Sequence, residues 1–534
     1  MSKNLKILQT NNMKKSSFVF GATVLAISGV LCKVLGAVYK VPLANMLKTE
    51  GIGIYYLVFP IYSLFLTLSS SCFPTVISRF VANAKAENKH KLANKIFVAS
   101  LIVLVVLGFV LGLIMLIFSN KIASAQGIEN GAVCYVVLSP AILFVAIISA
   151  FRGYFQGLQN MIPTAVSQII EQIVKFVIGI FLSVTLIKYG VIFAVLGAML
   201  GVVVSELFSL IYLLIYFVFT KKKNTKKQTI CNEYESIFSL IKKILKTTIP
   251  FFLNSILFPL FAVFDNFLVV KFLEKAGYEF SLASSILGIN TGIVNTIINL
   301  PVVVAASIAM AIIPSISFSY NRGDVVSIEN KVSVAIKFVF LISIPCVFMF
   351  MFFSREIVSL LFSGSIVTGY EFAVATNLLS FCSITVLYQS LLQIFVAVLQ
   401  AIKKAYAPTV IVFVSLIVKT VLEILLLLNS RFNVLAMGVS SFVCFFIATL
   451  CCFIVLKKHI KIELSFTKAT LFPCLFSVFM LIIVKGGLII LYKFIPAKIS
   501  ILLSFFIGGV LYLSLLYLFK IIDRKELFFA KNNE

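Results

Sequence analysis

Apolar runs of about twenty residues or more recur along the whole chain, and they constrain its fold more than any other feature. Each run is long enough to cross the hydrocarbon core of a bilayer as a helix, and too long for a strand of a membrane barrel. Hydrophobic residues make up 61% of the 534 residues, and charged residues only 12%. Because backbone groups in lipid must bond within their own segment, we predict an all-α polytopic membrane protein.

The apolar runs predict about fourteen transmembrane helices, each taken as roughly twenty residues or more. They lie near residues 17–44, 53–80, 96–119, 132–151, 164–187, 190–219, 248–273, 283–313, 333–353, 371–399, 408–428, 434–456, 469–492 and 499–520. The links on the side of the N-terminus, with both tails, hold roughly three times as many Lys and Arg as the opposite links. Both termini are therefore expected in the cytosol.

The net charge of +26 is explained by this topology, because the lysines lie in links between spans and not on a nucleic-acid surface. The ten cysteines form no CxxC pair and no metal-ligand spacing, and the two histidines lie in Lys-rich links. No phosphate-binding GxxxxGK[ST] loop is present. We expect no nucleic-acid partner, no metal, no cofactor, no catalytic residue and no cleaved signal peptide.

One stretch occurs twice. Phe151 to Lys175 reads FRGYFQGLQNMIPTAVSQIIEQIVK, and residues 399–420 read LQAIKKAYAPTVIVFVSLIVKT. Pro163 of the first copy can open a helix, since the first helical position needs no backbone donor, and Pro408 is its counterpart. The two copies lie about 240 residues apart, as do CFPTVIS and IIPSIS, which predicts a duplicated bundle.

The duplication predicts four parts. They are an N-terminal six-helix lobe at 1–219, a basic cytosolic linker at 220–247, a second six-helix lobe at 248–456, and two additional helices with a cytosolic tail at 457–534. The two lobes are expected to be pseudo-symmetric, with their axis along the membrane normal. The GxxxG spacings at Gly108/Gly112, Gly197/Gly201 and Gly288/Gly292 predict close helix packing.

Ionisable residues inside predicted spans are the candidate functional residues, because a charge in the bilayer is costly unless it faces protein or water. They are Lys33, Lys40, Glu171, Lys175, Glu206, Asp265, Lys337, Lys419, Glu423 and Lys485. Three of these candidates are weaker: Glu206, Lys337 and Lys485. Lys485 lies near a span end, from which its side chain can reach the membrane interface.

Spacing suggests how these residues group. Lys33 and Lys40 lie two helical turns apart on nearly one face. Glu171–Lys175 and Lys419–Glu423 are each i,i+4 pairs, so each is either a structural salt bridge or part of a substrate site. The duplication places Asp265 where the first copy has Lys33, so the two are expected to face each other across a cavity.

The opening span, ISGVLCKVLGAVYKVPLANMLKTEGIGIYYLVFPIY, carries a basic residue, Leu-Gly and a second basic residue. With SSSCFP, RGYFQGLQNMIPTAVSQIIEQ, FDNFLVVKFLEKAG and NLPVVVAASIAMAIIPSIS, it resembles the lipid-linked oligosaccharide flippase and polysaccharide exporter branch of the multidrug/oligosaccharidyl-lipid/polysaccharide superfamily. Within that branch the chain is most similar to the stage V sporulation protein B group, and more distantly to the lipid II flippases. The resemblance covers essentially the whole chain.

The resemblance implies a flippase that moves polyprenyl-pyrophosphate-linked saccharides across the bacterial cytoplasmic membrane by alternating access, as a monomer in contact with membrane lipids. The expected substrate-binding residues are then Lys33, Lys40, Asp265, Glu171, Lys175, Lys419 and Glu423. Two departures stand out: Lys replaces the commoner Arg in the first span, and Cys72 replaces a glycine. Lysine keeps the positive charge but loses the bidentate fork of arginine.

Two other classes of function remain. A multidrug/cation antiporter of the same superfamily would share the fold, but its cavity would be acidic, which Lys33 and Lys40 disfavour. A membrane glycosyltransferase or polymerase would need a sizeable outer loop with catalytic acids or His, and the outer links, near 123–131 and 355–369, are short and offer neither.

Overall fold

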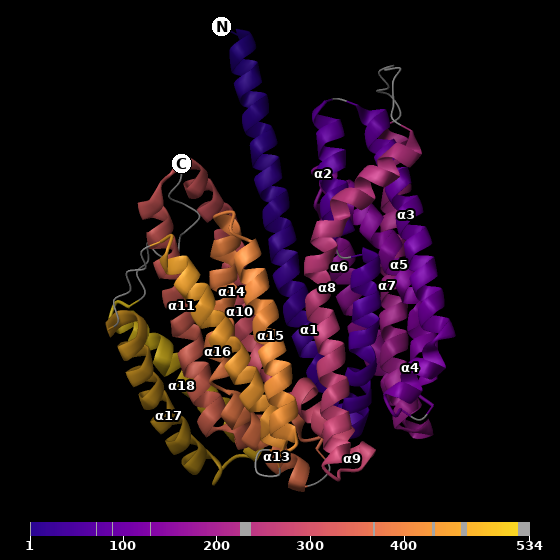
Figure 1. Cartoon of the computed structure of the whole chain (residues 1–534). Coiled ribbons are helices and arrows are strands. Elements are labelled where there is room, and N and C mark those ends of the chain that lie inside the picture. The colour runs from indigo at the N-terminus through magenta and orange to yellow at the C-terminus, as the bar shows by residue number, and fades with distance from the viewer. Residues whose placement is uncertain are drawn as a thin grey trace. The chain divides into compact units, whose positions relative to one another are not determined.

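The computed structural model of the chain describes residues 2–70, 72–87, 89–128, 130–224, 236–366, 369–429, 433–460 and 467–521 (Figure 1). Within these ranges every regular element is a helix and none is a strand, as the apolar pattern predicts. Residues 225–235 of the predicted linker and 522–534 of the predicted tail lie outside the described residues.

Within the described part of the chain, twelve helices are long and apolar enough to cross a membrane, or thirteen if the bent pair Gly369–Cys382 and Thr385–Ala401 is one span. Every predicted span overlaps one of these segments; the predicted span 53–80 lies inside Ile27–Ala86, and the predicted span 17–44 overlaps the start of the same segment. The backbone at Lys48 is non-helical, with φ 57°, which divides that long segment where the sequence predicts a link. The number of crossings and the cytosolic side of both termini stay predictions.

The chain divides into two compact units, the first formed by Met1–Val270 and Phe280–Gly288. Its elements are α1 (Ser2–Ser70), α2 (Phe73–Ala86), α3 (His90–Ile117), α4 (Ser119–Ala125), α5 (Ala132–Gly157), α6 (Ile162–Leu186), η1 (Ile187–Tyr189), α7 (Val191–Asn224), most of α8 (Ile237–Lys275) and α9 (Phe280–Gly288). Pro163 lies in the first turn of α6, as expected for a proline that opens a helix. The boundaries of the four parts inferred from the duplication stay a prediction, because a division into compact units does not test where a repeated sequence begins and ends.

The second unit is formed by Lys271–Glu279 and Ile289–Glu534. Its elements are η2 (Ile289–Val294), α10 (Asn295–Arg322), α11 (Val325–Phe352), α12 (Ser354–Phe362), α13 (Gly369–Cys382), α14 (Thr385–Ala401), α15 (Tyr406–Leu427), η3 (Asn433–Leu435), α16 (Ala436–Lys457), η4 (Thr467–Leu471), α17 (Phe472–Leu491) and α18 (Ala497–Leu518). Helices α17 and α18 pack side by side (Figure 1).

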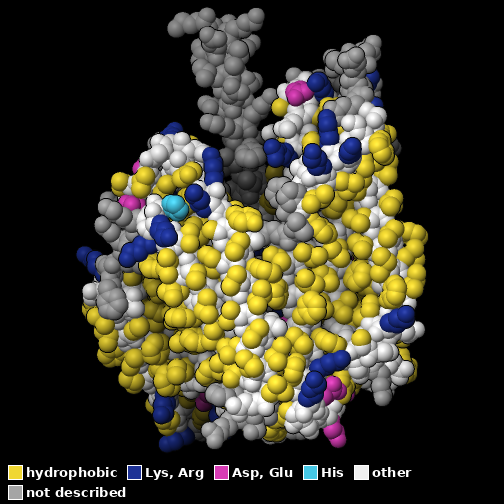
Figure 2. Space-filling view, in the orientation of Figure 1, with side chains coloured by type: hydrophobic (Ala, Val, Ile, Leu, Met, Phe, Trp, Pro, Cys, Tyr) yellow, Lys and Arg dark blue, Asp and Glu magenta, His cyan; other side chains and the backbone are white. Residues whose placement is uncertain are grey.

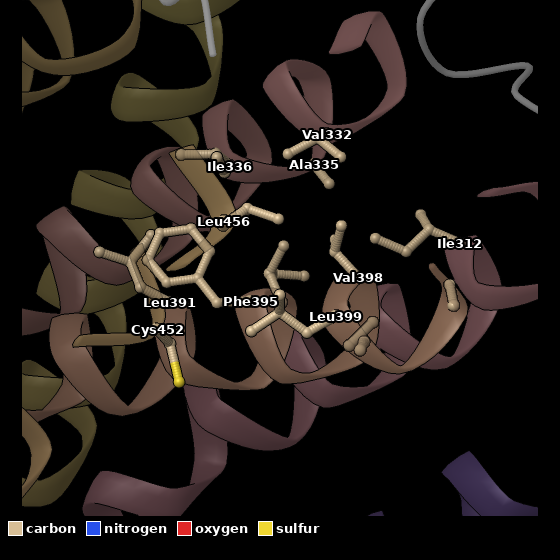
Figure 3. Close-up of a cluster of buried hydrophobic side chains, with 14 of the residues drawn as sticks. Ile312, Val332, Ala335, Ile336, Leu391, Phe395, Val398, Leu399, Cys452 and Leu456 are labelled. Carbon is tan, nitrogen blue, oxygen red and sulfur yellow. The ribbon is translucent and has the colours of Figure 1, made fainter. Parts of the chain in front are cut away.

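The core of the second unit is formed by apolar side chains from α10, α11, α14 and α16 that converge on one cluster (Figure 3). Its labelled members are Ile312, Val332, Ala335, Ile336, Leu391, Phe395, Val398, Leu399, Cys452 and Leu456. Cys452 lies in this cluster as a small apolar residue, which agrees with the packing role expected for cysteines within spans. This core holds α10 and α14 together, and both helices matter below.

The surface agrees with a membrane location. On the visible face of each unit, hydrophobic side chains cover the middle of the helices, whereas Lys and Arg gather toward the helix ends (Figure 2). Phe181 is 63% exposed and Phe506 is 70% exposed, an arrangement that is costly in water and favourable in lipid.

Glycines permit close helix crossings in the first unit. A Cβ atom on Gly201 of α7 would lie 2.3 Å from the Cα atom of Gly179 on α6, and one on Gly108 of α3 would lie 2.7 Å from the Cβ atom of Ala146 on α5. Both helix pairs are in contact, so the close packing expected from these GxxxG spacings is confirmed.

Substituting Gly201→Ala should therefore destabilise the protein by about 1–3 kcal/mol, because backbone on the facing helix would have to move. The matched control is Gly509→Ala in α18, where nothing lies within 4 Å of the added Cβ. Thermal unfolding of the purified protein in detergent compares the two. A Gly201→Ala variant as stable as the Gly509→Ala variant would contradict the α6–α7 packing.

Candidate functional site

Two predicted cations lie on α1 of the first unit. The Lys33 side chain is exposed and that of Lys40 is half-buried. The Lys40 Nζ atom lies 5.8 Å from the centre of the Tyr56 ring, on the part of α1 that follows the break at Lys48. A cation at this distance from an aromatic face is attracted by the ring electrons. Tyr56 therefore helps to hold one of the two charges in a defined place.

Lys175 also lies near an aromatic ring of α1. Its Nζ atom is 6.0 Å from the centre of the Tyr39 ring, and the same ring packs against Phe176 with 6.0 Å between ring centres. Tyr39 is buried at the crossing of α1 and α6, where Gly179 makes room for its hydroxyl group. The structure thus brings Lys40 and Lys175 each against a tyrosine of α1.

An ion pair joins α5 to α6 in the first unit. The guanidinium of Arg152 lies 2.9 Å from the Glu171 carboxylate, and both side chains are largely buried. Arg152 also donates hydrogen bonds to the hydroxyl oxygens of Ser167 on α6 and Ser209 on α7. One guanidinium therefore connects three helices, a geometry suited to its planar set of donors.

This pair differs from the prediction, in which Glu171 pairs with Lys175. The reason is the length of α5. It continues to Gly157, six residues past the predicted end of its span, and so places Arg152 inside the helix. The predicted span ends at its last apolar residue, Phe151, and therefore excludes Arg152, the partner of Glu171. The signal that could have revealed it is the unbroken helix-forming sequence AFRGYFQ before the turn at residues 158–160.

A second carboxyl group lies beside this ion pair. Glu206 of α7 is 6% exposed, and the charges of Glu171, Arg152 and Lys175 all act on it. The Tyr62 hydroxyl oxygen is buried and has no hydrogen-bond partner among the described residues. Glu206 appears in the sequence only as a weak candidate, because nothing in its spacing shows that α5 and α6 bring three other charges to it.

The second unit contains the predicted pair on α15. The Lys419 Nζ atom lies 2.9 Å from the Glu423 carboxylate, with both side chains largely buried, so this i,i+4 salt bridge is confirmed. In the first unit, Asp265 of α8 is half-buried, and its neighbour Asn266 donates a 2.7 Å hydrogen bond to the Tyr56 carbonyl oxygen. The expected approach of Asp265 to Lys33 stays a prediction.

No group of three His, Cys, Asp or Glu side chains that could hold a metal ion occurs in the part of the chain that the structure describes. The site residues are instead cations, ion pairs and half-buried polar groups within membrane-length helices. A helical bundle of this kind, with charged side chains inside its spans, is typical of a polytopic membrane transporter.

Comparison with known proteins specifies which transporter family. The sequence profile described as "Polysaccharide biosynthesis protein" matches residues 18–319, more than half of the chain, and a second profile, MatE, matches residues 250–425. The chain belongs to the polysaccharide biosynthesis protein family, in the lipid-linked oligosaccharide flippase branch of the multidrug/oligosaccharidyl-lipid/polysaccharide superfamily. It is a multi-pass cell-membrane protein.

Similar proteins agree with this placement. Stage V sporulation protein B of Bacillus subtilis is 27% identical over 412 residues, which cover 76% of this chain and 77% of that protein. Lipid II flippase MurJ of the same organism is 26% identical over 523 residues, covering 93% and 94%. The second of these relatives is named a flippase, and this chain is a membrane flippase of the same superfamily and not an enzyme.

Solved structures show the same fold. A lipid II flippase MurJ in an inward closed conformation matches with a TM-score of 0.69 at 16% identity, covering 93% of this chain and 98% of that one. An inward-facing multidrug resistance MATE family transporter matches with a TM-score of 0.60 at 16% identity, covering 80% and 96%. The all-α transporter fold expected from the sequence is confirmed.

The Arg152–Glu171 pair generates a prediction about stability. Arg152→Ala should cost about 3 kcal/mol, because it leaves a largely buried carboxylate without its ionic partner. The matched control is Glu87→Ala, which removes the exposed pair of Lys89 with Glu87 and should cost less than about 1 kcal/mol. Thermal unfolding in detergent measures both. Equal losses in the two variants would mean that the Arg152 pair contributes no more than a surface contact.

Proposed function

We propose that this protein is a flippase that moves polyprenyl-pyrophosphate-linked saccharides, either a peptidoglycan precursor or a polysaccharide unit, across the bacterial cytoplasmic membrane. The observation that carries the proposal is the pair Lys33 and Lys40 on one helix within the membrane. A pyrophosphate group must lose water to cross a bilayer, and two cations on one helix face supply compensating charge.

The surroundings of these lysines support the assignment. Lys33 is exposed and Lys40 half-buried, so both can be reached by a ligand, while the Tyr56 ring positions Lys40 without neutralising it. We assign the pyrophosphate to these two residues and propose Lys175 and Asp265 as further contacts. Glu171 and the Lys419–Glu423 pair, also expected as substrate residues, already have ionic partners: Glu171 pairs with Arg152 of α5, and Lys419 and Glu423 pair with each other within α15.

The relatives support the substrate class. Two of the similar proteins are named lipid II flippases, and the family profile is described as polysaccharide biosynthesis. We propose that transport follows alternating access, in which substrate shifts the population between two conformations. A monomer suffices for this cycle, with membrane lipids as the surrounding partner.

A multidrug/cation antiporter is the second candidate, favoured by the MatE profile match over residues 250–425. Such a transporter binds organic cations, for which a cavity wall rich in lysine is unfavourable. Lys33, Lys40 and Lys175 are three cations within the spans of one unit. They favour an anionic head group over a cationic drug.

The double variant Lys33→Ala/Lys40→Ala should lose transport of a polyprenyl-pyrophosphate saccharide at least about tenfold, because each charge-assisted contact is worth about 1.5–3 kcal/mol. Transbilayer movement of the lipid in proteoliposomes is the measurement. The control is Lys485→Ala, which removes an exposed lysine of α17, outside the duplicated lobes, and should leave transport unchanged. Wild-type transport by a folded double variant would contradict the assignment of the pyrophosphate.

A further inference from the structure

Four uncharged amide side chains lie on two packed helices of the second unit. Asn295 and Asn299 are one turn apart on α10, and Gln389 and Gln393 are one turn apart on α14. The two helices are in contact, and the Gln389 Nε2 atom donates a 3.4 Å hydrogen bond to the Asn299 Oδ1 atom. We call these four residues the amide cluster.

The amide cluster has more hydrogen-bonding capacity than the protein uses. Each amide offers two donors and an acceptor, yet the one long hydrogen bond within the cluster joins only two of the four side chains, Gln389 and Asn299. Asn295 and Gln393 make no side-chain hydrogen bond to any residue that the structure describes. Asn295, Asn299 and Gln389 are half-buried and Gln393 is exposed, so the unused groups remain accessible. Leaving such groups in hydrocarbon would be costly, which indicates that they face water or a polar ligand.

Both helices are interrupted beside the cluster. A π-helical turn, η2, ends at Val294, directly before Asn295. Helices α13 and α14 meet at a 48° bend, and α14 begins at Thr385, one turn before Gln389. Helix α13 also packs against η2, so the two interruptions are neighbours. Interrupted helices of this kind surround substrate sites in many transporters, and π-turns are frequent at functional sites.

Two buried hydroxyl groups accompany the cluster. The Thr296 Oγ1 and Ser390 Oγ atoms have no hydrogen-bond partner among the described residues, although the two residues are 2% and 0% exposed. Each follows a member of the amide cluster in the chain. Buried polar atoms without partners are rare in folded proteins, and these two lie on the same pair of helices as the unused amides.

We propose that the amide cluster binds the saccharide part of the transported lipid, an inference that rests on the proposed flippase function. Asparagine and glutamine offer donors and acceptors without charge, which matches the alternating donor and acceptor character of sugar hydroxyl groups. A pyrophosphate would favour cations, and a cation would favour carboxylates, which the cluster lacks. The cluster therefore recognises the neutral, hydroxyl-rich part of the substrate.

The test compares two lipids on the same purified, full-length protein. Undecaprenyl pyrophosphate and undecaprenyl-pyrophosphate-linked disaccharide are mixed with the protein in equal amounts, and native mass spectrometry gives the ratio of the two bound lipids. This ratio does not depend on the fraction of protein that is folded. Wild-type protein should prefer the glycan-bearing lipid, and Asn299→Leu/Gln389→Met should reduce that preference about tenfold, equivalent to about 1.4 kcal/mol.

Two single variants complete the design. Gln393→Met removes an exposed member of the cluster and should lower the preference about threefold, equivalent to about 0.6 kcal/mol, without disturbing packing. Gln400→Met changes another exposed glutamine of α14, two turns beyond the cluster, and should leave the preference at the wild-type value.

Each remaining outcome overturns the proposal in a different way. An unchanged preference in the double variant means that the sugar binds elsewhere. If the double variant loses binding of both lipids equally, the cluster has a structural role. If the preference of the wild-type protein disappears when Na⁺ is removed, the cluster binds a cation instead. If the wild-type protein binds neither lipid, the proposed flippase function is wrong as well. This outcome differs from the three above, in which only the assignment of the saccharide to the amide cluster is wrong.

Discussion

The absence of water inside a bilayer is the constraint on which the rest of this structure depends. Every backbone group must bond within its helix, and every polar side chain must find a partner in the protein or a hydrated surface. Arg152 shows the first solution, since its guanidinium is bonded to Glu171, Ser167 and Ser209. The exposed Lys33 and the amide cluster show the second, because their polar groups stay accessible within membrane-length helices.

These two solutions divide the polar residues by role. Charges with ionic partners on another helix, such as Glu171 with Arg152, hold helices at fixed positions and are expensive to disturb. Polar groups with unused capacity, such as Asn299 and Gln389, remain able to bind a ligand. In the proposed flippase, the uncharged amides of the second unit serve the saccharide. The polyprenyl tail requires no polar group and can stay in lipid.

Much of the fold could be predicted from the sequence. The length of an apolar run and the spacing of lysines can be read from neighbouring residues, without knowing how the helices pack. The position of Pro163 and the Lys419–Glu423 pair were predictable for the same reason, since both depend on residues within one or two turns. The partner of Glu171 was not, because Arg152 comes from another helix and its span was drawn too short. The amide cluster was also missed. Its members on α10 and its members on α14 are ninety or more residues apart in the chain, and only the packing of those helices brings them together.

The central claim is that the substrate is a polyprenyl-pyrophosphate-linked saccharide, and its most direct test is transport by the wild-type protein. The purified protein would be reconstituted in liposomes that carry a labelled undecaprenyl-pyrophosphate-linked disaccharide, and the rate of its movement between leaflets would be followed. We predict movement that is clearly faster than in protein-free liposomes and that an unlabelled lipid of the same class slows by competition. Movement no faster than in protein-free liposomes, together with transport of an organic cation by the same vesicles, would contradict the claim and identify an antiporter.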